Sequence, residues 1–142
     1  MRLFLDANVL FTAAYSPEGV SRALFGFARA GRCTLLTSRF ALDEAGRNLA
    51  VKAPRQMPEL TGLLDGLEVV EEAPLALVGR ARAAPIVEKD APILAAAWFC
   101  SAELLITGDR ADFGHLMGRP VGGLSVVTPR AVLELLLGRT DV

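Results

Sequence analysis

Runs of apolar residues alternate along this chain with segments whose apolar positions recur at helical spacing. Five short runs predict β-strands, because they are rich in the residues that strands favour and several are apolar nearly throughout. They are Leu3–Leu5 continuing towards Leu10, Thr34–Thr37, Glu68–Glu71, Leu104–Thr107 and Ser125–Thr128. A near-continuous apolar strand is typical of a parallel sheet that is covered on both faces.

The segments between these runs predict helices. The first begins at Ser16-Pro17-Glu18, where a serine suits the cap and a proline the first turn, and it ends at Gly31. The others run from Ser38 to near Pro54, from Pro58 to about Leu64, from Pro74 to about Ala84, from Ala91 to about Phe99, and onward from Pro129. This alternation predicts one α/β domain spanning residues 1–142, with three layers (α/β/α) around a central, mostly parallel five-stranded sheet.

Composition narrows the functional classes. The chain has 142 residues, 52% of them hydrophobic, and a formal charge of -1, which excludes intrinsic disorder and argues against broad, charge-driven attraction to nucleic acid or to an acidic membrane. No run approaches the roughly 20 apolar residues that span a bilayer. The two cysteines, Cys33 and Cys100, indicate neither a disulfide scaffold nor a thiolate zinc site. We therefore expect a cytoplasmic protein without a membrane segment, whose binding of any polyanion is local or assisted by a metal ion.

Four acidic residues fall where such a site is expected. Asp6 follows the first predicted strand, and Asp109 follows the run ending at Thr107 through a single glycine. Asp90 directly precedes a predicted helix, and Glu44 lies about two turns into the helix that leaves the second strand. Ligand sites of open parallel sheets lie beyond the carboxyl ends of the strands, so we expect these acids to converge at that edge.

Such a cluster predicts a metal ion. Neighbouring carboxylates repel one another when no Lys or Arg balances them, and a divalent cation removes that cost. Oxygen ligands select Mg²⁺ or Mn²⁺ over zinc, and the single histidine, His115, does not argue otherwise. An ion of this kind lowers the pKa of bound water and stabilises a leaving oxygen, which is the chemistry of metal-assisted phosphodiester hydrolysis.

Each acid also has a purely structural interpretation. Asp6 with Asn8 fits a strand-end turn whose side chains bond nearby amides, and Asp90 fits a helix N-cap. Glu44 fits an exposed pair with Arg47 or Asn48 on a solvated helix face.

Two further acids complicate the assignment. Asp43 is a rival of its neighbour Glu44, although its spacing to Arg47 better suits an exposed ion pair. Asp109 and Asp112 also fit a turn around Gly108. A structural role of this kind is common for any single acidic residue. Four acidic residues that all have such roles at one edge of the sheet would be less common.

Four segments in chain order resemble the motifs of the PIN-domain nucleases, particularly the VapC-like toxin branch. They are Leu3–Leu10, an apolar strand running into Asp-x-Asn; Ser38 with Glu44; Lys89–Ala97, an aspartate opening an alanine-rich helix; and Leu105–Phe113. The resemblance implies a PIN-like fold with a central first strand. It also implies a Mg²⁺- or Mn²⁺-dependent endoribonuclease that hydrolyses RNA as the toxin of a toxin-antitoxin pair, with an antitoxin protein as partner and a homodimer as the assembly.

The same resemblance assigns roles to individual residues. It implies that the catalytic, metal-binding quartet is Asp6, Glu44, Asp90 and Asp109. It adds Asp112 as a further metal ligand, with Asn8 and Thr107 as supporting polar residues, although Gly108 and Ala111 widen the spacing of the last two acids relative to the tightest family pattern.

Two other functions stay open at this point. One is a non-catalytic PIN-like module that binds RNA or a protein. The other is a phosphoryl-transfer enzyme with Asp6 as nucleophile, which usually needs a lysine near the phosphate. The lysines of this chain are Lys52 and Lys89.

Overall fold

A mostly parallel sheet forms the centre of the molecule. The computed structural model describes residues 1–84, 90–108 and 120–140. Its strands are β1 (Arg2–Leu5), β2 (Thr34–Ser38), β3 (Glu68–Val70), β4 (Leu104–Ile106), β5 (Pro120–Val121) and β6 (Leu124–Val127). The spatial order is β3-β2-β1-β4-β6-β5, in which every pairing is parallel except that of β5 with β6. All five predicted strands are present, although the first ends earlier than predicted, and the two-residue β5 adds a sixth that the sequence did not predict.

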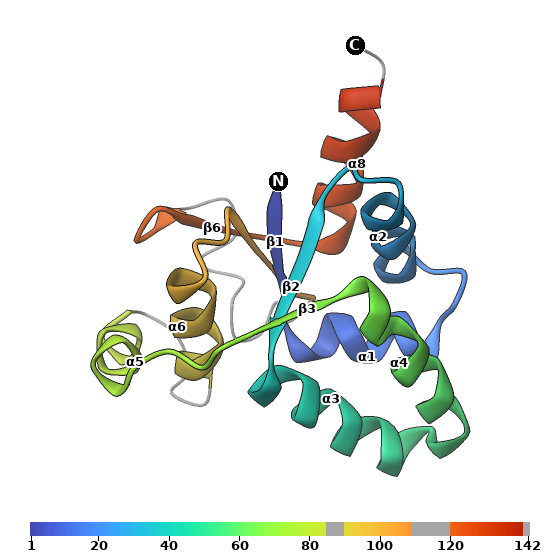
Figure 1. Cartoon of the computed structure of the whole chain (residues 1–142), viewed down its shortest axis with the longest axis horizontal. Helices are drawn as coiled ribbons and strands as arrows, with labels where there is room; N and C mark the ends of the chain where they lie inside the picture. The colour runs from blue at the N-terminus through green and yellow to red at the C-terminus, as the bar shows by residue number, and fades with distance from the viewer. Residues whose placement is uncertain (85–89, 109–119, 141–142) are drawn as a thin grey trace.

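Helices cover both faces of this sheet, as the predicted three-layer architecture requires. They are α1 (Ala7–Tyr15), α2 (Val20–Arg29), α3 (Arg39–Lys52), α4 (Met57–Leu63), α5 (Leu75–Arg82), α6 (Ala91–Phe99) and α8 (Pro129–Thr140), with short 3₁₀ turns η1 (Pro54–Gln56) and η2 (Leu64–Gly66). Figure 1 shows α5 and α6 on one side of β1 and β2, and α1, α2 and α8 on the other. No helix in the described part of the chain is both long and apolar enough to cross a membrane.

The chain departs from prediction just after β1. The strand ends at Leu5 instead of continuing towards Leu10, and α1 begins at Ala7. The apolar Val9 and Leu10 were interpreted as strand, but the buried residues of this segment recur at the spacing of a helix face, since Ala13 follows Val9 by four positions. The helix predicted from Ser16 is therefore preceded by α1, and α2 begins only at Val20.

The core fixes β1 in the middle of the sheet. Leu3, Phe4 and Leu5 are completely buried, as are Ile93 and Leu94 of α6. Burying each large apolar side chain contributes about 1.5–3 kcal/mol, so the polar residue that follows β1 is held firmly at the centre of the sheet's carboxyl edge.

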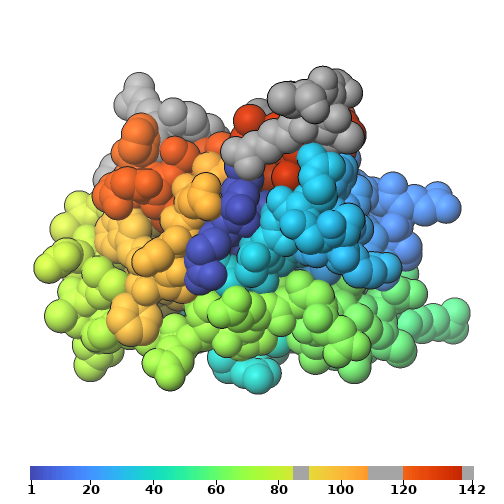
Figure 2. Space-filling model, turned by 45° about the horizontal axis from the view of Figure 1, so that its top comes forward, coloured from blue at the N-terminus to red at the C-terminus, as the bar shows by residue number. Residues whose placement is uncertain are grey.

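The opposite edge is occupied by the beginning of the chain. Figure 2 shows the first residues between the segment leading into β4 and the start of β2. Backbone bonds agree with this view, because the Thr34 amide donates to the Met1 carbonyl at 2.9 Å and the Glu103 amide to the Arg2 carbonyl at 2.8 Å. The candidate site therefore lies at the other end of the strands.

Candidate active site

A polar network joins the carboxyl ends of β1 and β4. Asp6 is only 3% exposed and forms the N-cap of α1, where its Oδ1 accepts the Ala7 amide at 2.7 Å. Its Oδ2 accepts the Thr107 hydroxyl at 2.7 Å and the Asn8 side-chain amide at 2.9 Å. The Gly108 amide donates to Oδ1 of Asn8 at 2.8 Å. Asn8 and Thr107, the two predicted supporting residues, thus hold the Asp6 carboxylate in one orientation.

A cavity of about 210 Å³ opens beside this network. We call it the acidic cavity. Its lining residues are Asp6, Asn8, Phe11, Thr12, Glu44, Asn48, Lys52 and Asp90. Three of the four predicted metal-binding acids, which come from distant parts of the sequence, therefore share one cavity. The fourth, Asp109, and the further candidate Asp112 lie outside the described residues.

The position of Glu44 follows from the start of α3. The Ser38 hydroxyl caps this helix by accepting the Ala41 amide at 3.2 Å, and the resulting helix presents Glu44, half-buried, to the cavity. Asp43 is exposed and does not line it. Within the described part of the chain, Glu44 makes no ion pair with Arg47. The interpretation of Glu44 as half of an exposed ion pair is therefore wrong.

Asp90 is 7% exposed and directly precedes α6. The prediction that its side chain caps this helix is wrong, because it makes no capping hydrogen bond to the described residues of α6. The reason is conformational. An N-cap residue needs extended backbone, whereas Asp90 has helical angles, with φ -95° and ψ -3°.

One basic residue joins the acids, contrary to the expectation that no Lys or Arg balances them. Lys52 lines the acidic cavity, and its Nζ lies 5.6 Å from the centroid of the Phe11 ring, within the range of a cation–π contact. Its position could have been predicted, because Glu44, Asn48 and Lys52 follow one another at four-residue spacing along one face of a helix.

Solved structures supply an independent view of the fold. No protein-family model and no curated protein matches this sequence. VapBC2 from Rickettsia felis, bound to a DNA fragment from its promoter, is 18% identical with a TM-score of 0.70, over 90% of this chain and 98% of that one. The chain has a VapC-like PIN fold.

Two further structures of this PIN-like fold are similar. A toxin-antitoxin complex from Klebsiella pneumoniae is 22% identical with a TM-score of 0.61, over 89% of this chain and 97% of that one. VapC20 from Mycobacterium tuberculosis, described as a sarcin-ricin loop cleaving toxin, is 13% identical with a TM-score of 0.54, over 77% and 92% of the two chains. At these identities the likeness establishes the fold.

The side chains of the acidic cavity suit a hard cation by their chemistry. Carboxylate and amide oxygens are the ligands that Mg²⁺ and Mn²⁺ accept in proteins, and the cavity is lined by the carboxylate residues Asp6, Glu44 and Asp90. Among the described residues, however, no three Asp, Glu, His or Cys side chains are close enough together to hold one ion. The donor type therefore fits such a metal, while the described acids do not by themselves complete a coordination shell.

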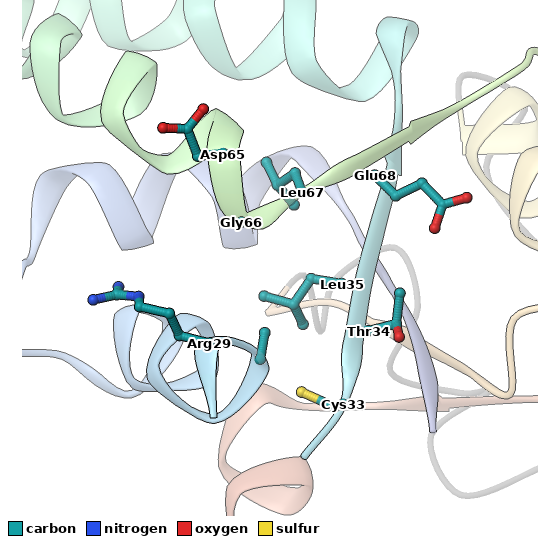
Figure 3. A pocket seen from close by; sticks show the side chains of 9 residues that line it. Arg29, Cys33, Thr34, Leu35, Asp65, Gly66, Leu67 and Glu68 are labelled. Carbon is teal, nitrogen blue, oxygen red and sulfur yellow. The ribbon is translucent and has the colours of Figure 1, made fainter. Parts of the chain in front are cut away.

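Another cavity, of about 370 Å³, lies at the opposite edge of the sheet. Figure 3 shows Cys33 and Leu35 of the β2 segment on the same side as Arg29 and Asp65, with the Thr34 side chain on the other side of the strand. Burial raises the pKa of the Cys33 thiol. Because this cavity adjoins the amino ends of β2 and β3, it is separate from the acidic cavity.

Proposed function

We propose that this protein is an endoribonuclease dependent on Mg²⁺ or Mn²⁺ that hydrolyses RNA phosphodiester bonds as the toxin of a toxin-antitoxin pair. The observation that carries the proposal is the gathering of Asp6, Glu44 and Asp90 on one cavity beyond the carboxyl ends of parallel strands. The proposed role as a toxin is supported by the similar structures, one of which is described as a toxin-antitoxin complex and another as a sarcin-ricin loop cleaving toxin.

A bound cation would take its ligands from the acidic cavity, where Asp6, Glu44 and Asp90 supply carboxylates that do not by themselves complete the coordination shell, and from Asp109 and Asp112, the further predicted ligands. It would supply an activated water and neutralise phosphate charge. Asp6 contributes a carboxylate already oriented by hydrogen bonds from Ala7, Asn8 and Thr107. Such preorganisation avoids a reorganisation cost during the reaction.

Two residues of α3 have different roles in this scheme. Glu44, which is half-buried and faces the cavity, can accept a proton from the attacking water as a general base. Lys52 brings an ammonium group to the same cavity, where it attracts the phosphate of the substrate as a point charge. Lys52 thus neutralises part of the charge of the RNA phosphate, and a cation held by the acids would neutralise the rest.

The proposal is tested by incubating the wild-type protein and an Asp6→Asn variant with labelled single-stranded and structured RNA in Mg²⁺, in Mn²⁺ or in a chelator. We expect cleavage by the wild-type protein with either metal and none with the chelator or with Asp6→Asn. Asparagine keeps the size of the side chain and one oxygen that can cap α1, while it removes the negative charge. Equal cleavage by both proteins would indicate a contaminating nuclease and remove the support for this site.

The non-catalytic module is separated from the enzyme by calorimetry. An enzyme of the proposed kind takes up Mg²⁺ or Mn²⁺ in a manner that depends on Glu44, whereas a module that merely retains the fold has no need to do so. Heat of binding that is identical for wild type and Glu44→Gln would favour the module.

One observation favours the phosphoryl-transfer alternative. Lys52 lines the same cavity as Asp6. A phospho-aspartate enzyme requires a lysine at such a position. Against it, both oxygens of Asp6 already accept hydrogen bonds, Oδ1 from Ala7 and Oδ2 from Thr107 and Asn8, so attack on phosphorus would compete with them. Incubation with an acyl phosphate donor, followed by trapping of a phospho-aspartate, distinguishes this chemistry from hydrolysis.

The partners of the proposed toxin are an antitoxin protein and a second copy of the chain. Co-expression with the product of a small neighbouring gene tests the first, and light scattering of the purified protein tests the second. Neutralisation of the nuclease by the co-expressed product would establish the toxin role, while cleavage without any such partner would indicate general RNA processing. Access to cellular RNA agrees with the cytoplasmic location expected from the sequence.

A further inference from the structure

A third cavity adjoins the acidic one. It has a volume of about 430 Å³, and we call it the flanking cavity. Thr12 lines both cavities. They also meet at the hydrogen bond between Gly108, which lines the flanking cavity, and Asn8, which lines the acidic cavity. A flexible polymer held in the acidic cavity can therefore continue into the flanking one.

The N-terminus of α8 forms one wall of the flanking cavity. Thr128 caps the helix by accepting the Ala131 amide on its hydroxyl at 3.2 Å and the Val132 amide on its carbonyl at 3.2 Å. Pro129 has no amide hydrogen, and the Arg130 amide makes no hydrogen bond with the described residues. The free amide, the helix dipole and the exposed Arg130 guanidinium all favour an anion at this wall.

A serine of α2 that lines the flanking cavity points independently to a ligand. Ser21 of α2 is 4% exposed and lines the flanking cavity. Its hydroxyl makes no hydrogen bond with any described residue. Since Ser21 lines the cavity and its hydroxyl can both donate and accept a hydrogen bond, it is suited to donate to an acceptor placed there.

Glu134 decides what kind of anion fits. This exposed carboxylate lies one turn beyond Arg130 on α8 and lines the same cavity, so it weakens the attraction for a free anion. In an RNA strand, one phosphate can be held in the acidic cavity while the next one enters the flanking cavity. The second phosphate then binds in an intramolecular step, which offsets the repulsion by Glu134. A ribose 2′-hydroxyl can also donate to Glu134.

We propose that the flanking cavity binds the phosphate of a nucleotide adjacent to the cleaved bond in an RNA strand, through the Ser21 hydroxyl, the Arg130 side chain and the N-terminus of α8. This inference rests on the proposed function, since it takes the acidic cavity as the place of cleavage. It assigns a substrate-binding role to two residues, Ser21 and Arg130, that contribute nothing to the acidic cavity.

The test measures binding rather than cleavage. A Glu44→Gln background keeps the RNA intact and leaves the Asn8–Gly108 contact in place. Fluorescence anisotropy in Mg²⁺ then compares a labelled RNA octamer with a dinucleoside monophosphate, which has a single phosphate and fills the acidic cavity alone. The variants are Arg130→Gln and Ser21→Ala, and the matched control is Arg29→Gln, an exposed arginine at the opposite edge of the sheet.

We expect Arg130→Gln to weaken octamer binding roughly tenfold and to lower the slope of log affinity against log salt by about one. Ser21→Ala weakens octamer binding severalfold with an unchanged melting temperature, since the hydroxyl it removes has no described partner. Neither change alters dinucleotide binding, and Arg29→Gln alters neither affinity.

The inference would be overturned if the variants bound the octamer as tightly as the background protein does. It would also be overturned if dinucleotide binding fell equally, or if no RNA bound at all. Failure of the proposed function has a separate signature. If the wild-type protein does not cleave RNA while the octamer still binds in a manner dependent on Arg130 and Ser21, the flanking site stands and the nuclease proposal falls.

Discussion

The hydroxyl of Thr107 donates a hydrogen bond of 2.7 Å to Oδ2 of Asp6, and so joins the residue after β4 to the residue after β1. Both side chains are almost fully buried. The bond links the two central strands of the sheet at the point where the acidic cavity opens, and it fixes the orientation of the Asp6 carboxylate.

Substitution of Thr107 by valine keeps the shape of the side chain and removes this donor. We expect a loss of about 1–3 kcal/mol in the free energy of unfolding, because a buried carboxylate oxygen loses a partner, together with slower RNA cleavage. Urea denaturation measures the first effect. Thr107→Ser, which retains the hydroxyl, is the control and should preserve cleavage; a valine variant as active as wild type would show that the orientation of Asp6 is not needed.

Removal of the Lys52 charge tests the role of the residue that the sequence interpretation missed. Lys52→Met retains the stem that packs on Phe11 and removes the ammonium, so we expect a higher KM for RNA, a nearly unchanged kcat and a salt dependence of binding that falls by about one. Steady-state kinetics at several ionic strengths check this. Lys52→Arg should restore the salt dependence, and a fall in kcat alone would contradict a role in holding the phosphate.

Metal binding should stabilise the folded protein. An ion that binds only the native state raises the free energy of unfolding by an amount that grows with its concentration. We expect the melting temperature of the wild-type protein to rise with added Mn²⁺ or Mg²⁺, and that of Asp90→Asn to rise less. Calcium-free chelated buffer gives the reference, and parallel rises in the two proteins would exclude Asp90 from the metal site.

Gly122 has no room for a side chain, whereas its neighbour Gly123 does. It has φ +59°, and a Cβ there would lie 2.9 Å from the indole nitrogen of Trp98, which donates to the Val121 carbonyl at 2.8 Å. Gly123 also has a positive φ, of +83°, but no atom within 4 Å of a Cβ. Gly122→Ala should therefore destabilise the protein by more than Gly123→Ala, for which backbone strain alone costs about 1–3 kcal/mol. Thermal unfolding of the pair measures the difference, and equal losses would show that the indole can move aside.

Burial raises the pKa of Cys33 above its ordinary value of 9.0, so the thiolate is scarce at neutral pH. We expect Cys33 in the folded protein to react with iodoacetamide more slowly than in the denatured chain. The raised pKa also makes the free energy of unfolding depend on pH. The unfolded chain releases this proton first, so the contribution of Cys33 to stability is complete below about pH 9 and is lost above it. Mass spectrometry of alkylated peptides over a pH series checks the reactivity; equal rates in the two states would contradict it.

The central strands β1, β2 and β4 were predictable because they are apolar runs whose residues are mostly buried. Hydrophobic pattern could not separate the end of β1 from the start of α1, since Val9 and Leu10 are apolar in either element. The decisive feature is local and polar, namely Asp6 accepting the amide of Ala7. β5 has only two residues, too few for any periodicity.

The candidate site was predictable in part for a related reason. The convergence of Asp6, Glu44 and Asp90 follows from strand order and helix spacing. The backbone angles of Asp90 cannot be predicted from strand order or helix spacing, and these angles are the reason why its side chain does not cap α6. Lys52 is eight residues from Glu44 along the chain, and only the turns of α3 bring it to the same cavity.

The central claim is that the gathered carboxylates perform the chemistry, and adjacent positions on α3 test it most directly. Glu44 faces the acidic cavity and Asp43 is exposed beside it, so Glu44→Gln and Asp43→Asn remove the same charge one residue apart. Single-turnover cleavage of labelled RNA in Mg²⁺ should fall at least a hundredfold in Glu44→Gln, within the range that general-base groups contribute, and stay at the wild-type rate in Asp43→Asn. Equal rates in the two variants would contradict the account.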